Sequence, residues 1–189
     1  MTPQPPTRDE PLLTPDQIRA QFWADSRQRV CAVAMGSRLP GLRERLASAD
    51  VADYDCLVPG ALSASEQAKA AYLIELLERS AFTDWLLFEA PLSLGEWGTV
   101  TVTEAPRLTL RAHLRSLREC LLPDGQRIEL DWMDPEVLAL LLPLFGRAEL
   151  QDFMGPMRGL AIPRGDGWSM ARIVAGQLQW RHARVAPSA

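Results

Sequence analysis

The sequence has few of the side chains that most often perform catalysis. Its 189 residues include two histidines, His113 and His182, and three cysteines, Cys31, Cys56 and Cys120, without CxxC spacing. An odd number of cysteines without that spacing is typical of reduced thiols in a cytoplasm rather than of a disulfide scaffold. The scarcity of histidine also limits which catalytic and metal sites the chain can build.

Long hydrophobic stretches are missing as well. No apolar run approaches the roughly 20 residues of a membrane span, and the first ten residues contain no hydrophobic signal segment. We therefore expect a cytoplasmic protein with no membrane span. An apolar fraction of 47% and a charged fraction of 23% are typical of a globular domain and exclude a disordered, collagen-like or coiled-coil chain. The length suits one domain.

Lysine is almost absent, since nineteen of the twenty basic residues are arginine and the other is Lys69. The net charge of −4 is spread unevenly. Arginine dominates from Arg107 to Arg118 and from Arg158 to Arg184, whereas acids dominate residues 50–104 and 127–152. Such bands are typical of solvated faces, but they also fit docking patches for a protein partner. An acidic chain without a basic, aromatic-interleaved motif is not expected to bind nucleic acid.

Predicted strands and helices alternate along the chain. Helices are predicted over residues 14–29, 39–49, 83–88, 107–122, 134–142 and 147–154. Strands are predicted over residues 30–35, 54–58, 97–102, 128–132, 160–163, 170–174 and 178–180. The alternation favours an α/β domain, with α+β as the alternative: a mixed central sheet flanked by helices, plus a short strand-rich tail at the C-terminus. Residues 1–13 hold four prolines and are predicted to be a disordered arm.

Residues 63–77 allow two interpretations. Ser63 and Glu66 form a capping box, which favours a helix running on through Leu77. The apolar run from Tyr72 to Leu77 also suits a buried strand, and periodicity alone does not decide between the two.

The clearest predicted helix begins at Arg107. Its leucines at 110, 114, 117 and 121 fall on one face, and an arginine stripe lies beside them. The stripe consists of Arg107, Arg111, Arg115 and Arg118. A later helix is predicted to begin with Asp134 as its N-cap, Pro135 in the first position and Glu136 in the first turn.

No catalytic or metal-binding pattern is complete. His113 lies at the edge of the leucine face, and no serine or cysteine motif supplies a partner for it, so we interpret it as a structural histidine. Glu129, Asp131, Asp134 and Glu136 are close in sequence but lack calcium-loop spacing. We predict no metal, no cofactor and no enzymatic activity.

The six tryptophans include two in predicted strands of the domain and two in the C-terminal tail. Trp97 and Trp132 fall in predicted strands and are expected in the core. Trp168 and Trp180 lie in the basic C-terminal tail, where they suit either interface anchors or side chains that pin the tail to the domain, and the sequence favours neither.

An ordered set of short motifs between Trp97 and Pro156 resembles the adaptor, or effector-chaperone, family of bacterial type VI secretion systems. The set consists of Trp97, His113-Leu114-Arg115, Asp134-Pro135, Phe153 and Gly155-Pro156. Upstream, residues 32–36, 54–58 and 72–76 are similar to the family's first three strands, which favours a strand at 72–76. The resemblance covers roughly residues 30–156.

The resemblance implies an adaptor domain over residues 14–156, with a helix at 14–29 and a core at 30–156. A short basic tail at 157–189 then corresponds to the region that varies with the cargo. Such adaptors are not enzymes. They hold a toxin, the secreted effector, in the cytoplasm and load it onto the trimeric valine–glycine-repeat spike protein.

The sequence departs from the family at two charges. Asp131 and Glu136 stand where relatives often carry arginine, which implies a different partner surface there. The candidate partner-binding residues are Arg107, Arg111, Arg115, Arg118, Asp131, Glu136, Trp168 and Trp180. The alternatives are an immunity protein that blocks a toxin and a small hydrolase that uses His113 or His182.

Overall fold

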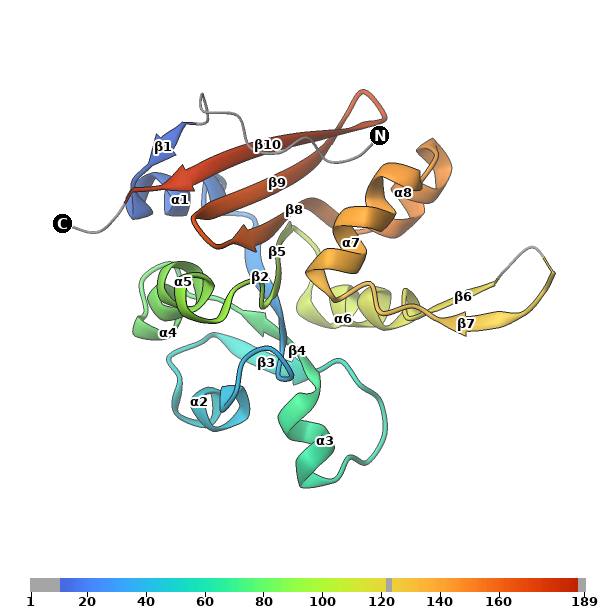
Figure 1. Ribbon diagram of the computed structural model, residues 1–189, viewed down its shortest axis with the longest axis horizontal. Helices are drawn as coiled ribbons and strands as arrows, with labels where there is room; N and C mark the ends of the chain where they lie inside the picture. The colour runs from blue at the N-terminus through green and yellow to red at the C-terminus, as the bar shows by residue number, and fades with distance from the viewer. Residues whose placement is uncertain (1–10, 122–123, 187–189) are drawn as a thin grey trace.

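Eight strands pair into one sheet that runs through the molecule, with helices against both faces (Figure 1). A computed structural model describes residues 11–121 and 124–186 of the chain. The strands of this sheet are β1 (Leu12–Leu13), β2 (Arg29–Met35), β3 (Asp53–Cys56), β4 (Ala71–Glu75), β5 (Gly98–Thr103), β8 (Met157–Arg164), β9 (Gly167–Val174) and β10 (Gln177–Val185). Their spatial order is β1-β10-β9-β8-β5-β2-β4-β3, and every neighbouring pair is antiparallel except β1 and β10.

The helices connect these strands in the predicted alternating order. They are α1 (Pro15–Phe22), α2 (Leu42–Ser48), α3 (Ala64–Lys69), α4 (Ala81–Asp84), the π-helical turn η1 (Trp85–Glu89), α5 (Ala90–Leu94), α6 (Arg107–Ser116), α7 (Pro135–Leu141), the 3-10 turn η2 (Leu142–Leu144) and α8 (Arg147–Met154). The predicted α/β fold with a mixed central sheet is confirmed.

Strand β2 shows why the sheet is covered on both sides. Val30, Ala32 and Ala34 belong to one apolar cluster, to which α1, α2 and the α4–α5 segment contribute. Cys31 and Val33 belong to a second cluster, formed with α6, α7 and α8. A strand buried on both faces has no polar alternation, and this accounts for the continuous apolar run at residues 30–35. Burial also raises the pKa of the Cys31 thiol to about 12, so this cysteine is inert.

The ambiguous segment contains both predicted elements. Ser63 and Glu66 form the predicted capping box at the start of α3, but the helix ends at Lys69 and β4 begins at Ala71. Residues 71–74 are buried in the sheet, so the apolar run belongs to the strand and the capping box to a helix of only six residues.

The N-terminal predictions need correction. The capping box of Thr14 and Gln17 is present, but α1 ends at Phe22 and not at residue 29. Leu12–Leu13, placed by the sequence in a disordered arm, form β1 alongside Arg184 and Val185 of β10. Residues 1–10 of the predicted arm lie outside the described residues.

The C-terminal segment is part of the central sheet and not an appended tail. β8 pairs with β5, β9 pairs with β8, and β10 pairs with β9. Trp168 and Met170 of β9 are buried in one apolar cluster, and Ala171 is buried in the other. The boundary predicted at residue 156 therefore does not divide the structure.

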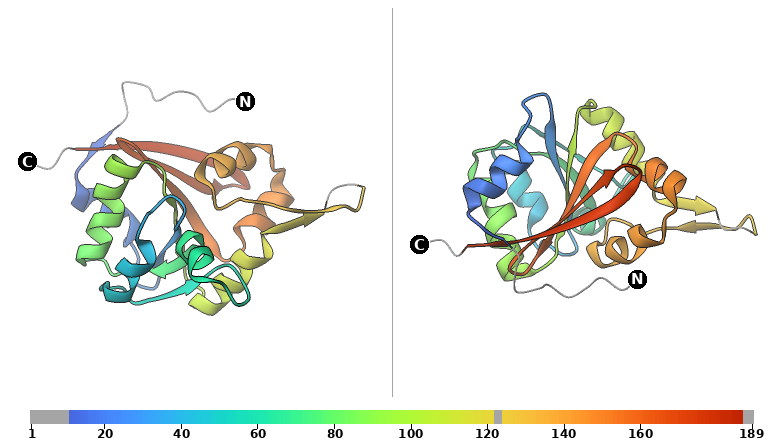
Figure 2. Two further views of the ribbon diagram at one scale, coloured as in Figure 1. Left: turned by 60° about the horizontal axis from the view of Figure 1, so that its bottom comes forward. Right: turned by 90° about the horizontal axis from the view of Figure 1, so that it is seen from above.

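A second, two-stranded sheet corrects the predicted helix at 107–122. α6 ends at Ser116, and β6 (Glu119–Leu121) pairs with β7 (Arg127–Glu129) in a hairpin that projects from the body of the molecule (Figure 2). The turn at Asp124–Gly125 brings these two strands together, and this pairing overrides the helical pattern of the preceding residues. The strand predicted at 128–132 ends at Glu129, and Trp132 is buried in the connection to α7.

Candidate interaction site

Two of the four arginines of the stripe, Arg107 and Arg111, form ion pairs within the chain. Arg107 forms ion pairs with Asp53, at 2.6 Å, and with Asp55. Arg111 donates a hydrogen bond of 2.8 Å from its Nη1 to the Oδ1 of Asp55. The Arg107 side chain is only 19% exposed. These two arginines therefore fasten α6 to the edge strand β3 and are not free charges on a docking surface.

The other two arginines of the stripe lie toward the projecting hairpin. Arg118 pairs with Glu129 of β7. Arg115 donates a hydrogen bond of 2.7 Å to the carbonyl oxygen of Cys56 and has no acidic partner among the described residues. Arg115 is thus the member of the stripe whose charge remains available to a partner.

A cavity of about 420 Å³ lies between the projecting hairpin, the end of α6 and the loop after β3. It is lined by Pro59, Arg115, Arg118, Glu119, Arg127, Ile128 and Glu129. Charges of both signs at an open cavity suit a polar segment of another protein better than an apolar small molecule.

His113 makes a contact that suits the structural role predicted from the sequence. Its Nε2 lies 2.9 Å from the carbonyl oxygen of Phe153, and because a carbonyl only accepts, Nε2 carries the proton. Gly155 has a φ of +46°, and a Cβ at this position would lie 2.4 Å from the Cε1 of His113. Pro156 follows, and its carbonyl accepts a hydrogen bond from Thr103 Oγ1 at 2.9 Å. The motif residues thus join α6, the end of α8 and β5.

The two tryptophans of the C-terminal segment differ from each other. Trp168 is 2% exposed and packs edge-on against Phe22 of α1 and against Trp97. It pins β9 into the core, so the alternative of an interface anchor is wrong for this residue. Trp180 is half-buried and stacks on His182, with a ring separation of 6.4 Å. The exposed part of the Trp180 side chain remains available to a partner.

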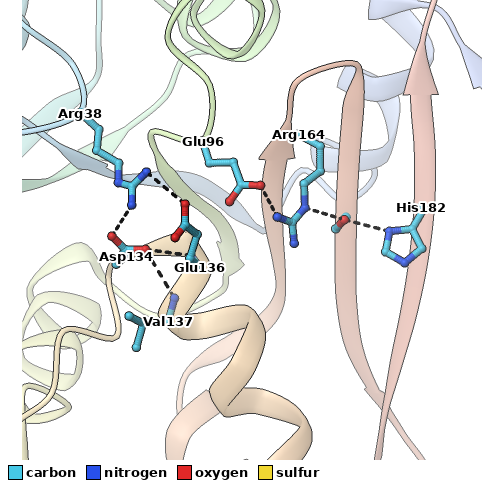
Figure 3. Close-up of polar contacts among 8 residues, drawn as sticks. Arg38, Glu96, Asp134, Glu136, Val137, Arg164 and His182 are labelled. Carbon is cyan, nitrogen blue, oxygen red and sulfur yellow. Dashed lines mark hydrogen bonds and ion pairs between the residues drawn. The ribbon is translucent and has the colours of Figure 1, made fainter. Parts of the chain in front are cut away.

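Asp134 connects α7 to the loop after β2 (Figure 3). Its Oδ1 accepts a hydrogen bond of 2.8 Å from the backbone N–H of Glu136, and its other oxygen pairs with Arg38. Burial raises the pKa of Asp134, but the hydrogen bond from Arg38 and the backbone hydrogen bond from Glu136 outweigh it, so the pKa lies below its ordinary value. Asp134 is therefore the predicted cap, and also one half of a long-range ion pair.

The two charges that depart from the family pattern lie on either side of this cap. Glu136 is exposed, with its carboxylate 3.8 Å from Arg38. Asp131 is exposed as well, and desolvation together with the negative charge of Asp134 raises the pKa of its carboxyl. Both acids face solvent, where a partner can contact them.

A second polar chain joins four residues on and beside the C-terminal strands (Figure 3). Glu96 pairs with Arg164, whose Nε donates to the Oγ of Ser169 at 3.1 Å, and this Oγ lies 2.8 Å from the Nδ1 of His182. Ser169 is only 2% exposed and its oxygen accepts from an arginine. Because the serine is buried and its oxygen already accepts a hydrogen bond, we interpret this serine–histidine contact as a structural link.

Sequence reasoning missed the contact between Ser169 and His182, although a signal for it exists. Ala175–Gly176 is the two-residue turn between β9 and β10. A two-residue hairpin turn fixes the register of its strands and so places Ser169 opposite His182, as observed.

Within residues 11–121 and 124–186, no group of three or more histidine, cysteine or acidic side chains is placed to hold a metal ion. Over the same residues, no helix has the length and apolar character needed to cross a membrane.

Comparison with known protein families gives one match. A family model described as a domain of unknown function, DUF4123, matches residues 32–152, which is more than half of the chain. The chain belongs to the DUF4123 family. This family is associated with adaptors of type VI secretion effectors. Searches of curated proteins and of solved structures gave no match.

The DUF4123 segment contains most, but not all, of the candidate residues. The arginine stripe, Trp97, His113, Asp131 and the Asp134–Glu136 cap lie inside it. The match ends at residue 152, within α8, so the motif residues Phe153, Gly155 and Pro156 follow it directly. Trp168, Trp180 and the strands β8–β10 also lie after the match. Four strands of the central sheet, β1 and β8–β10, are therefore not covered by the DUF4123 match.

Proposed function

We propose that this protein is an adaptor that binds a type VI secretion toxin in the cytoplasm and loads it onto the trimeric valine–glycine-repeat spike protein, without performing chemistry itself. The observation that carries the proposal is membership of the DUF4123 family together with that family's association with effector adaptors.

The arrangement of side chains supports a binding role. His113 and His182 both have hydrogen-bonding partners that a structural role explains. The cavity beside Arg115, the projecting β6–β7 hairpin and the exposed leucines Leu140 and Leu144 are features that a protein partner can cover.

Co-purification with the toxin and the spike tests the proposal. The chain carries an affinity tag and is expressed together with any toxin and spike genes that are found beside its own gene. We expect the chain to retain both proteins. Arg115→Glu should weaken retention of one of them, because it reverses the cavity's unpaired charge. Arg43→Glu, at an exposed arginine of α2 on another part of the surface, is the matched control and should bind like the native chain.

Two further outcomes would replace the proposal with another function. If the chain alone protects cells from the toxin and does not bind the spike, it is an immunity protein. If His113→Ala and His182→Ala abolish toxin delivery while the variants stay folded and keep both partners, a hydrolytic role is the better account. Binding of neither partner would contradict the adaptor function outright.

A further inference from the structure

The outer edge of β10 carries unpaired backbone groups. Along a strand, successive N–H groups point to opposite neighbours. The N–H of Arg184 points outward, since it donates to the carbonyl oxygen of Pro11 at 3.0 Å, whereas the N–H of Val185 donates inward to Asp166 at 2.8 Å. By this alternation the N–H groups of Leu178, Trp180 and His182 also point outward.

Little of this edge is covered within the described part of the chain. β1 is two residues long and lies beside only the C-terminal end of β10, as Figure 1 shows. From Gln177 to Ala183, no strand among residues 11–121 and 124–186 pairs with the outer side. The pairing of Pro11–Leu13 shows that this edge accepts an additional strand, and among the described residues no strand lies next to its first seven residues.

The strand lacks two of the usual protections of an exposed edge, a proline and a β-bulge. β10 contains no proline, and its register with β9 has no bulge over eight consecutive pairs. Natural sheet edges without such features are templates for pairing with another chain.

The side chains along the edge indicate what would pair there. Trp180 and His182 stack half-buried on one face of the strand. On the other face Gln179 and Arg181 are exposed, and Gln179 stands opposite Arg172 of β9. Neither Arg172 nor Arg181 has an acidic partner within 4.0 Å among the described residues. The edge therefore offers apolar contact on one face and positive charge on the other.

We propose that an extended segment of the toxin, with acidic and apolar residues in alternation, adds to the outer edge of β10 as a further strand. Its backbone hydrogen-bonds to Leu178, Trp180 and His182, its acidic side chains face Arg181 and Arg172, and its apolar side chains lie along Trp180. The inference rests on the proposed function only for the identity of the partner. β10 follows the segment matched by the family model, so this edge is a part of the chain that the match does not describe.

Amide hydrogen exchange in the full chain tests whether the edge is open. We expect the amides of Leu178, Trp180 and His182 to exchange much faster than those of Gln179, Arg181 and Ala183. Slow exchange at the outward amides that is lost on deleting residues 1–10 would mean that the chain fills its own edge. Slow exchange that depends on protein concentration would mean that a second copy does. Either result would overturn the proposal.

A labelled ten-residue peptide of alternating valine and glutamate tests the chemistry of the edge. We expect fluorescence anisotropy to show binding, and the outward amides to become protected. Arg181→Glu should weaken binding about tenfold, because it replaces attraction by repulsion, whereas the control Arg43→Glu should leave it unchanged. The same peptide N-methylated at alternate residues should not bind. Equal binding of the methylated peptide, or no protection of the outward amides, would overturn the proposal.

The toxin itself separates this inference from the proposed function. Toxin that binds the chain without protecting the outward amides, and equally well to Arg181→Glu, would overturn the edge inference and leave the adaptor function intact. Protection produced by the spike and not by the toxin would also overturn it. If the peptide protects the edge but the toxin binds no form of the chain, the adaptor function fails instead.

Discussion

At the scale of single residues, His113 and Gly155 constrain each other. The backbone of Gly155 has a positive φ, and the imidazole of His113 occupies the space where a Cβ would be. The sequence predicted that His113 is structural, because it lies at the edge of an apolar helical face. It did not reveal the partner, the carbonyl of Phe153 forty residues away, because only the tertiary fold brings the two together.

Gly155→Ala should therefore be strongly destabilising. The strained φ and the contact with His113 together should cost about 2–4 kcal/mol of unfolding free energy, measured by urea denaturation. Gly41→Ala is the matched control, because Gly41 also has a positive φ, +77°, but a Cβ there would meet nothing within 4 Å. It should cost only about 1 kcal/mol. Equal costs for the two variants would contradict the proposed steric contact.

A double variant checks the same contact. In His113→Ala/Gly155→Ala the ring that blocks the new methyl group is gone, so the combined cost should be clearly less than the sum of the two single costs. Additive costs would show that the two positions are independent.

At the scale of secondary-structure elements, the helix caps were predicted well, whereas the ends of α1 and α6 were not. The caps at Thr14, Ser63 and Asp134 are local hydrogen bonds and are all present. The length of α6 was overestimated, because the pairing of β6 with β7 depends on residues beyond the helix. The role of the arginine stripe could not be read from one helix, since its acidic partners lie on β3 and β7.

Asp134 allows a pH-dependent test. Asp134→Asn keeps a capping side chain but loses the ion pair with Arg38, and at neutral pH it should cost about 1 kcal/mol of unfolding free energy. The native pKa of Asp134 is lowered, so the folded state binds fewer protons than the unfolded state. The stabilisation is therefore fully present above the ordinary pKa of about 3.9 and is lost as the pH falls through the lower native value.

Urea denaturation across this pH range measures the effect. The gap between the native protein and Asp134→Asn should close below about pH 4. Asp134→Ala, which also removes the cap, should remain less stable by about 1 kcal/mol throughout. A gap for Asp134→Asn that does not change with pH would contradict the role of the ion pair.

The attachment of α6 to β3 gives another prediction at this scale. Asp55→Ala removes the carboxylate shared by Arg107 and Arg111, both largely covered, and should cost about 1–3 kcal/mol in a thermal or urea melt. Glu119→Ala breaks the exposed pair with Arg127 on the projecting hairpin and should cost about 0.5 kcal/mol or less. The opposite ranking would show that the β3 contact is not structural.

At the scale of the whole molecule, the C-terminal segment decides whether the sheet is complete. The sequence indicated its strands, but assigned them to a tail because the segment after residue 156 is short and basic and was not expected to have much core of its own. Pairing with β5 buries Leu160, Ala161 and Ile162, and Trp168 closes the core against α1. The β5–β8 pairs join residues about 60 positions apart, such as Val100 and Ala161, and the contact of Trp168 with Phe22 spans more than a hundred residues, so neither can be derived from local pattern.

Truncation after residue 156 should consequently prevent folding, as judged by circular dichroism and size-exclusion chromatography. Trp168→Ala should cost about 3–5 kcal/mol, because it leaves a large cavity in the core. Trp180→Ala, at a half-buried position of the neighbouring strand, should cost much less. A folded truncated chain would restore the boundary that the sequence first suggested.

The most direct test of the adaptor function uses three purified proteins: this chain, its toxin and the spike. The spike is immobilised, and the toxin that it retains is measured with and without the chain. The adaptor function predicts that the spike retains the toxin only when the chain is present, and that the toxin is recovered intact and active. Retention of the toxin without the chain, or a chain that binds neither protein, would contradict it.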